Sequence, residues 1–100
     1  MIKATIVRSP EGMIIGFSVR NHGESIVCAA VSMLVLNTVD SIETFTDADF
    51  SCEYQEEGGY LAFSLSSVGH ERASLLLDAM YLGLSMAGDE YPDEISLMEV

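Results

Sequence analysis

The chain has 100 residues, 49% of them hydrophobic, and its 16 acidic and 4 basic side chains give a formal net charge of −12 at pH 7. A chain of this length forms one domain, spanning residues 1–100, and its hydrophobic content excludes a disordered acidic tail. The scarcity of lysine and arginine disfavours direct binding to nucleic acid, while the acidic surface either keeps the protein soluble or attracts a basic partner.

The first elements in chain order are two short strands. Residues 1–8, MIKATIVR, alternate apolar and polar side chains, which indicates a strand. The turn sequence SPEG follows, and MIIGFSVR predicts a second strand that closes a hairpin. His22 lies where this second strand should end.

A helix should follow the hairpin. Ser25 is a favourable N-cap residue, and the pattern behind it predicts a helix from about Ile26 to about Glu43. This run is apolar enough to be the central helix of the domain. We expect its apolar face to consist of Ile26, Ala29, Ala30, Met33, Leu34 and Ile42, widened by Val27, Val31 and Val35.

The second half of the chain repeats the order of hairpin and helix. FSCEYQE and YLAFSLS alternate as strands around an EGG turn, and GHERASLLLDAMYLGLSMAGDEYP contains a long amphipathic helix that ends before Pro92. ISLMEV forms a short last strand. The order ββαββαβ predicts an α+β fold, a two-layer domain with two helices packed on a mainly antiparallel sheet. The stripe of the second helix is Ala73, Leu76, Leu77, Met80, Leu84 and Ala87.

The segment NHGESIVC contains residues of the kind that perform nucleophilic catalysis. If Ser25 caps the helix, Cys28 is the third helical residue, where amide groups without intrahelical partners and the helix dipole favour a thiolate. A short loop containing Gly23 could place the imidazole of His22 beside the sulfur, as in a thiolate–imidazolium pair. The same amides could stabilise an oxyanion. A buried core thiol and an ordinary loop histidine explain the same spacing, so the residues alone leave both interpretations open.

The remaining candidate residues favour structural roles. Alternation places Cys52 on one face with Phe50 and Tyr54, which predicts a core thiol. His70 has no recognisable partner in the sequence, so we expect a surface histidine. Met80 and Met86 should pack in the core or at a dimer interface, and the acidic residues at 89, 90, 93 and 94 should form a solvated helix end. Cys28 and Cys52 form no CxxC pair and only two histidines accompany them, so we expect no metal site and no cofactor.

The stretch GFSVRNH followed by GESIVCAAVS resembles the signature of the ribosomal-processing cysteine proteases, the Prp family. The GGYLAF hairpin and the long helix after it also fit. The resemblance implies a homodimeric cysteine protease that removes a short N-terminal extension from a bacterial large-subunit ribosomal protein, cutting after an aromatic residue. It implies that His22 is the general base and Cys28 the nucleophile.

The resemblance does not determine the roles of several residues. Ser32 matches a serine that the family carries one turn after the cysteine, although a packing role is equally compatible with a small residue there. Asn21 replaces a glycine, Ser25 replaces an aspartate, and the loop after His22 is shorter than in many relatives. These departures affect the orientation of His22 and the contacts available to a peptide.

Two other functions remain open from the sequence. One is a non-catalytic acidic dimeric module that binds a ribosomal protein without cleaving it, and the other is a thiol redox sensor that uses Cys28. No apolar stretch reads as long and pure enough to span a bilayer, and the N-terminus lacks the apolar core of a signal peptide. We therefore expect a cytoplasmic protein that does not act at a membrane.

Overall fold

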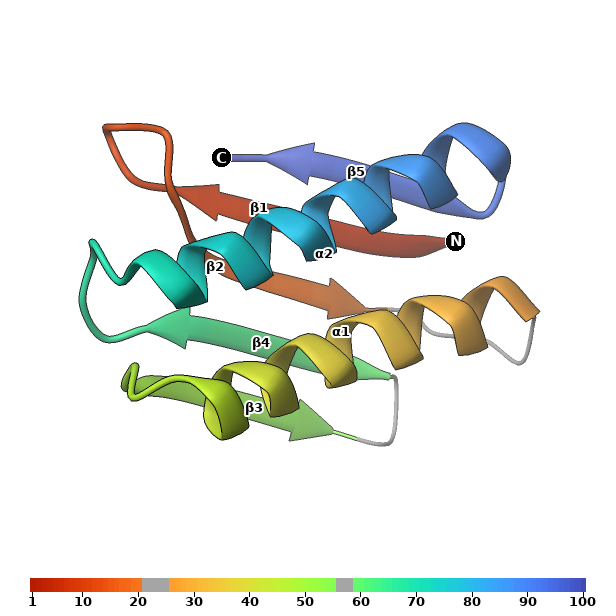
Figure 1. Cartoon of the computed structure of the whole chain (residues 1–100). Coiled ribbons are helices and arrows are strands. Elements are labelled where there is room, and N and C mark those ends of the chain that lie inside the picture. The colour runs from red at the N-terminus through yellow and green to blue at the C-terminus, as the bar shows by residue number, and fades with distance from the viewer. Residues whose placement is uncertain (21–25, 56–58) are drawn as a thin grey trace.

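The computed structural model describes residues 1–20, 26–55 and 59–100. These residues form two layers, with a five-stranded sheet on one side and two helices on the other (Figure 1). The elements follow in the order β1 (Ile2–Arg8), β2 (Ile14–Arg20), α1 (Ile26–Phe45), β3 (Phe50–Gln55), β4 (Tyr60–Leu65), α2 (Glu71–Glu90) and β5 (Ile95–Glu99). The predicted ββαββαβ order and the α+β class are therefore confirmed.

The sheet is mixed, with the strand order β3-β4-β2-β1-β5. The first three neighbouring pairs are antiparallel, while β5 lies parallel to β1 because α2 carries the chain back across the sheet before β5 begins. β3 and β5 are the edge strands. The sheet is thus mainly antiparallel, as the two hairpins in the sequence predict.

Two glycines are required by the backbone of the first hairpin. Gly12 has a φ of +89°, in the turn that SPEG indicates, and a side chain is disfavoured in that conformation. Gly16 in β2 lies so close to β4 that a Cβ atom would be 2.8 Å from the carbonyl oxygen of Phe63. A side chain at this position would clash with the backbone of β4, so the pairing of β2 with β4 requires a glycine here.

The core lies between the helices and one face of the sheet. Ile6, Phe17 and Val19 point into it from the central strands, and each is no more than 2% exposed. The ring of Phe63 stacks on Phe17 at 5.2 Å and contacts Phe50 at 5.0 Å between ring centroids. These aromatic contacts extend the core from the central strands to β3.

The second helix follows its predicted pattern. Ala73, Leu77, Met80 and Leu84 are its buried residues, and each is at most 1% exposed. The helix ends at Glu90, two residues before Pro92, and residues 89, 90, 93 and 94 are exposed as expected. Met80 is in the core, whereas Met86 is 64% exposed and so does not pack there.

The first helix buries a different face from the predicted one. Ile26 and Met33, which were expected in the stripe, are 87% and 70% exposed. Every side of this helix carries apolar residues, so their spacing could not identify the side that the sheet covers. Ile42, from the predicted stripe, and the three valines expected only to widen it are buried. The buried residues of α1 are Val27, Cys28, Val31, Val35, Thr38, Val39 and Ile42.

The length and composition of α1 alone would allow it to cross a membrane, so the expectation that no stretch reaches that threshold was wrong. Its residues Val31, Val35 and Ile42 nevertheless belong to the same buried cluster as the strands and α2. A core helix that is apolar on several sides passes the same test as a membrane span.

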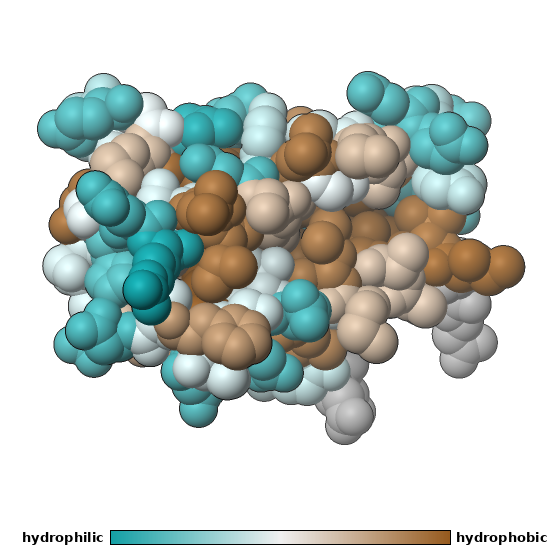
Figure 2. Space-filling view, viewed as in Figure 1, coloured by the Kyte–Doolittle hydropathy of each residue, from teal (hydrophilic) through white to brown (hydrophobic). Residues whose placement is uncertain are grey.

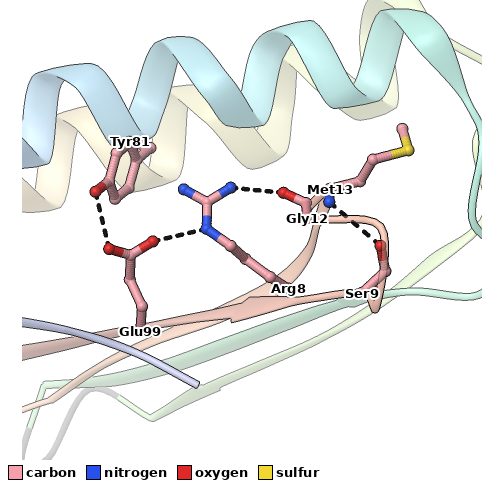
Figure 3. Close-up of polar contacts among 6 residues, drawn as sticks. All are labelled: Arg8, Ser9, Gly12, Met13, Tyr81 and Glu99. Atoms are coloured by element: carbon pink, nitrogen blue, oxygen red, sulfur yellow. Dashed lines mark hydrogen bonds and ion pairs between the residues drawn. The ribbon is translucent and has the colours of Figure 1, made fainter.

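A polar cluster fastens the C-terminal strand to the rest of the fold (Figure 3). Glu99 of β5 accepts a hydrogen bond from Arg8 Nε at 2.6 Å and one from the hydroxyl of Tyr81 at 3.1 Å. Arg8 also donates to the carbonyl oxygen of Gly12 at 2.8 Å, and its guanidinium lies over the Tyr81 ring at 4.9 Å. The cluster joins β1, β5, α2 and the first turn.

Candidate active site

Cys28 is the third residue of α1 and lies in its first turn, as predicted. Its side chain shares the sheet-facing side of the helix with Val31 and Val35, which are three and seven positions further along. A nucleophile at the start of a helix is expected to be partly accessible, but Cys28 is only 4% exposed, so that expectation was wrong. A reagent or substrate must reach the sulfur from the end or the flank of the helix.

The start of α1 is electrostatically favourable for an anion. Amide groups of a first helical turn lack intrahelical acceptors, and the helix dipole places its positive end there. The first turn of α1 contains no acidic side chain that would compensate this positive end. A thiolate or an oxyanion formed at Cys28 would therefore be stabilised by the backbone itself.

His22, Asn21, Ser25 and Gly23 lie outside the described residues, so the pairing of His22 with Cys28, the Ser25 cap and the shortened loop stay predictions. β2 ends at Arg20, two positions before His22 in the sequence. Ser32 is half-buried on α1, four residues after Cys28, and its role also stays a prediction.

Several strand ends meet at the end of the molecule where α1 begins. In Figure 1 the end of β2, the beginning of β4 and the end of β3 all lie on the side of the sheet that holds the start of α1. The guanidinium of Arg20 lies 5.2 Å from the centre of the Tyr60 ring, which ties the last residue of β2 to the first of β4.

Cys52 is exposed, so its prediction as a core thiol was wrong. It faces the helix layer, because it lies opposite the buried Phe63 in the β3–β4 register. β3 is an edge strand, however, and the helices do not cover it along its full length. Partial desolvation raises the pKa of the Cys52 thiol, and the nearby carboxylate of Asp40 raises it further.

His70 has a defined partner, which the sequence did not reveal. Its Nε2 lies 2.6 Å from Oδ1 of Asp47, and its Nδ1 accepts a hydrogen bond from the amide of Ala73, so that His70 caps α2. The bond from His70 lowers the pKa of the Asp47 carboxyl. His70 therefore lies at the surface, as expected, with 26% of its side chain exposed, but it has two partners that were not predicted. The position of His70 directly before an amphipathic helix was the signal that could have indicated a cap.

A cavity of about 630 Å³ lies beside this pair. It lies between the C-terminal end of α1 and the N-terminal end of α2, far along α1 from Cys28. Among the described residues no group of three histidine, cysteine or acidic side chains could hold a metal ion. The residues that line the cavity are Thr44, Phe45, Thr46, Asp47, Gly69, His70, Glu71 and Arg72.

The sequence of this chain matches one known family over almost its whole length. Residues 1–96 match the family model described as Cysteine protease Prp. The chain belongs to this family. It is 30% identical to the ribosomal processing cysteine protease Prp of Bacillus subtilis, over 95% of this chain and 94% of that protein. It is 26% identical to the protein of the same name from Staphylococcus aureus, over 97% of each.

Solved structures agree with the family assignment. The S. aureus Prp in complex with a covalently linked product peptide has a TM-score of 0.94 and 26% identity, over 100% of both chains. The same protease in complex with a substrate peptide has a TM-score of 0.95 at 24% identity, again over 100% of both chains, and shows the fold. SMU.848 from Streptococcus mutans is 31% identical, with a TM-score of 0.91 over 100% of this chain and 94% of that one. The chain is thus a cysteine protease of the Prp family.

Proposed function

We propose that this Prp-family protease removes the N-terminal extension of a bacterial large-subunit ribosomal protein in the cytoplasm, with Cys28 as nucleophile and His22 as general base. The observation that carries the proposal is the place of Cys28 in the first turn of α1. The match over nearly the whole chain to proteases named for ribosomal processing supports the substrate class. No cofactor is required for this chemistry.

The reaction divides into two steps at the start of α1. The thiolate of Cys28 attacks the scissile carbonyl, the first-turn amides stabilise the oxyanion, and the imidazolium of His22 protonates the leaving amine. A thioester to the acyl part of the substrate remains. Neutral His22 then accepts a proton from water, which attacks the thioester and releases the carboxylate and the thiol.

The charge of the chain suits a basic substrate. With 16 acidic and 4 basic residues, the protein attracts a positively charged ribosomal protein and repels the phosphate backbone of nucleic acid. Direct nucleic-acid binding is therefore not part of the proposed function.

The proposed enzyme acts as a homodimer joined through the outer face of α2. Leu75, Leu82 and Met86 lie on one side of this helix, and they are 70%, 62% and 64% exposed. Figure 2 shows hydrophobic side chains gathered over the helix layer. A small domain buries a modest fraction of its surface, so pairing this stripe with its copy would add to stability.

Sedimentation of Leu82→Asp should show monomers where the wild type shows dimers. A wild-type chain that stays monomeric at micromolar concentration contradicts the dimer.

The decisive experiment incubates the protein with the cognate large-subunit ribosomal protein and measures the products by mass spectrometry. We expect loss of a short N-terminal peptide with the wild type and none with Cys28→Ala. A stable complex with intact substrate would instead support the alternative, a non-catalytic acidic module that binds the ribosomal protein. Cleavage by Cys28→Ala at the wild-type rate would eliminate Cys28 as nucleophile.

A further inference from the structure

The outer edge of β5 is open to a further strand. Among the described strands β5 pairs with β1 alone, and it forms one border of the sheet (Figure 1). Just after β5, the amide of Val100 donates to the carbonyl oxygen of Ile6 at 2.9 Å, and the carbonyl oxygen of Val100 accepts from the amide of Arg8 at 3.1 Å. Alternate residues of a strand direct their backbone groups to opposite sides, so those of Leu97 and Glu99 face away from β1. β5 contains no proline or lysine that would block pairing at this edge.

A pocket of about 300 Å³ lies between α2 and β5. Gly83 faces Leu34 of α1, and Gly88 lies on the other flank of α2, beside β5. Because Gly88 has no side chain, the space next to Leu97 stays open. Leu97 packs against the core from the face of β5 that α2 covers, so a residue paired with it would point its side chain toward the pocket. The lining residues are Ser85, Gly88, Asp89, Pro92, Ile95 and Leu97.

The start of β5 is strongly acidic. Four exposed carboxylates precede the strand, and no described residue forms an ion pair with them. The basic residues of β1 do not compensate this charge, because Arg8 binds Glu99 and Lys3 alternates with the buried residues of β1, which places it on the other face of the sheet. This end of the edge therefore attracts cationic side chains. The four carboxylates belong to Asp89, Glu90, Asp93 and Glu94.

We propose that the outer edge of β5 binds an extended basic segment of the substrate protein as an added strand, at a surface separate from Cys28. Backbone hydrogen bonds to Leu97 and Glu99 hold the segment, and an apolar side chain enters the pocket beside Gly88. Lysine or arginine side chains of the segment lie against the four carboxylates. A second copy of this chain, with a net charge of −12, would be repelled there.

The inference rests on the proposed function for the identity of the partner. In Figure 1 the start of β5 and the start of α1 lie at the same end of the molecule, so one substrate chain can reach both. Binding at the edge of β5 would raise the local concentration of the N-terminal extension near Cys28. The whole ribosomal protein should therefore have a lower KM than a short peptide that contains the extension alone.

The first test compares these two substrates. The triple variant Asp89→Asn, Asp93→Asn, Glu94→Gln should raise KM for the whole ribosomal protein by roughly tenfold, because it removes three of the four charges. It should leave kcat for the whole protein, and both constants for the short peptide, near the wild-type values. An equal change for the two substrates, or no change for either, overturns the proposal.

A matched control removes the same amount of charge elsewhere. Glu43→Gln, Glu71→Gln and Asp78→Asn neutralise three exposed carboxylates on the two helices, away from β5. This combination should change KM for the whole protein by less than about twofold, since the attraction falls off over roughly a Debye length. An effect as large as that of the first triple variant would mean that net charge alone attracts the substrate, and it would overturn the site at β5.

A second pair of variants tests the pocket. Gly88→Leu should fill it and raise KM for the whole protein alone. Gly88→Ala is the control, because a Cβ atom there would lie 3.7 Å from Cγ2 of Ile95, an ordinary contact that leaves most of the pocket empty. Circular dichroism should show that both variants keep the fold. If Gly88→Leu instead changes sedimentation and leaves KM unaltered, the edge binds a second copy and the proposal is wrong.

Binding without cleavage separates failure of this inference from failure of the proposed function. Absence of cleavage by the wild type contradicts the proposed function, whereas overlapping labelled peptides of the ribosomal protein, added to Cys28→Ala and followed by fluorescence anisotropy, still decide the edge. A basic peptide from outside the extension should bind, and adding Gly88→Leu should abolish its binding. N-methylation of one set of alternate residues in that peptide should also abolish binding, while N-methylation of the other set should not, because only one set faces β5. Absence of any such peptide, binding that survives Gly88→Leu, or equal effects of the two methylated sets overturns the proposal.

Discussion

The first turn of α1 and the middle of β3 each carry one cysteine, and the two thiols differ in exposure and in electrostatic surroundings. Cys28 is 4% exposed and lies at the positive end of a helix, while Cys52 is exposed on an edge strand beside the carboxylate of Asp40. The less exposed thiol is the one that we propose as the nucleophile. Exposure and the proposed function therefore point to different cysteines.

The largest expected effect is on activity. Cys28→Ala should lower peptide cleavage by roughly a thousandfold or more, because it removes the nucleophile, while Cys52→Ala should cleave at the wild-type rate. Circular dichroism should show that both variants keep the fold. Equal loss of activity in the two variants would remove the functional distinction between the two regions.

The next largest effect is on stability. It distinguishes the buried aromatic side chains next to β3 from the exposed side chains on that strand. Phe63→Ala should lower the free energy of unfolding by about 3–5 kcal/mol, because Phe63 is buried between Phe17 and Phe50. Cys52→Ala, directly opposite Phe63 in the register, should change it by less than about 0.5 kcal/mol. Urea unfolding measures both. A large cost for Cys52→Ala would mean that β3 is covered in solution.

The pH dependence of alkylation should sharpen the comparison between the thiols. In a variant that retains only Cys52, the alkylation rate should reach half its maximum at a higher pH than for an ordinary exposed cysteine, because desolvation and the carboxylate of Asp40 raise the pKa of the Cys52 thiol. Asp40→Asn should move this midpoint toward lower pH. An unshifted midpoint would contradict the electrostatic influence of Asp40 on Cys52.

The smallest effect concerns the histidine at the other end of α1. The hydrogen bond from His70 lowers the pKa of the Asp47 carboxyl below its ordinary value of 3.8. Since the folded-state pKa is lowered, this bond stabilises the fold above that ordinary value, and its contribution is lost as the pH falls through the folded-state pKa. Asp47→Asn should therefore slightly lower the melting temperature at neutral pH and leave it unchanged in strong acid.

Cleavage should be the same in Asp47→Asn and the wild type, because this pair lies far along α1 from Cys28. A marked loss of activity in Asp47→Asn at unchanged melting temperature would show that the two ends of the helix are coupled.

Much of the fold could be predicted because its signals are local. Alternation in MIKATIVR and MIIGFSVR, the glycine in the turn between them and the 3.6-residue stripe of α2 each depend on neighbouring residues. Placing Cys28 in a first turn required only the start of an apolar helix. The resemblance of IVCAAVS to the Prp signature then indicated the family, which the full-length match confirms.

Three of the expectations that failed depend on which elements meet in space. α1 is apolar on every side, so only its packing on the sheet decided that Val31 and Val35 are buried and Met33 is exposed. Cys52 has the alternation of a core residue, but β3 became an edge strand that the helices cover incompletely. Asp47 and His70 are 23 positions apart, and no local pattern links them.

The sequence by itself therefore determined the order of elements, the helix start that holds Cys28 and the family, because these follow from short-range periodicity and a contiguous motif. Only the tertiary structure decided the depth of Cys28, the exposure of Cys52, and the pair of Asp47 with His70. The physical reason is that burial and electrostatic contact depend on distances between elements, which the order β3-β4-β2-β1-β5 and the oblique crossing of α1 establish.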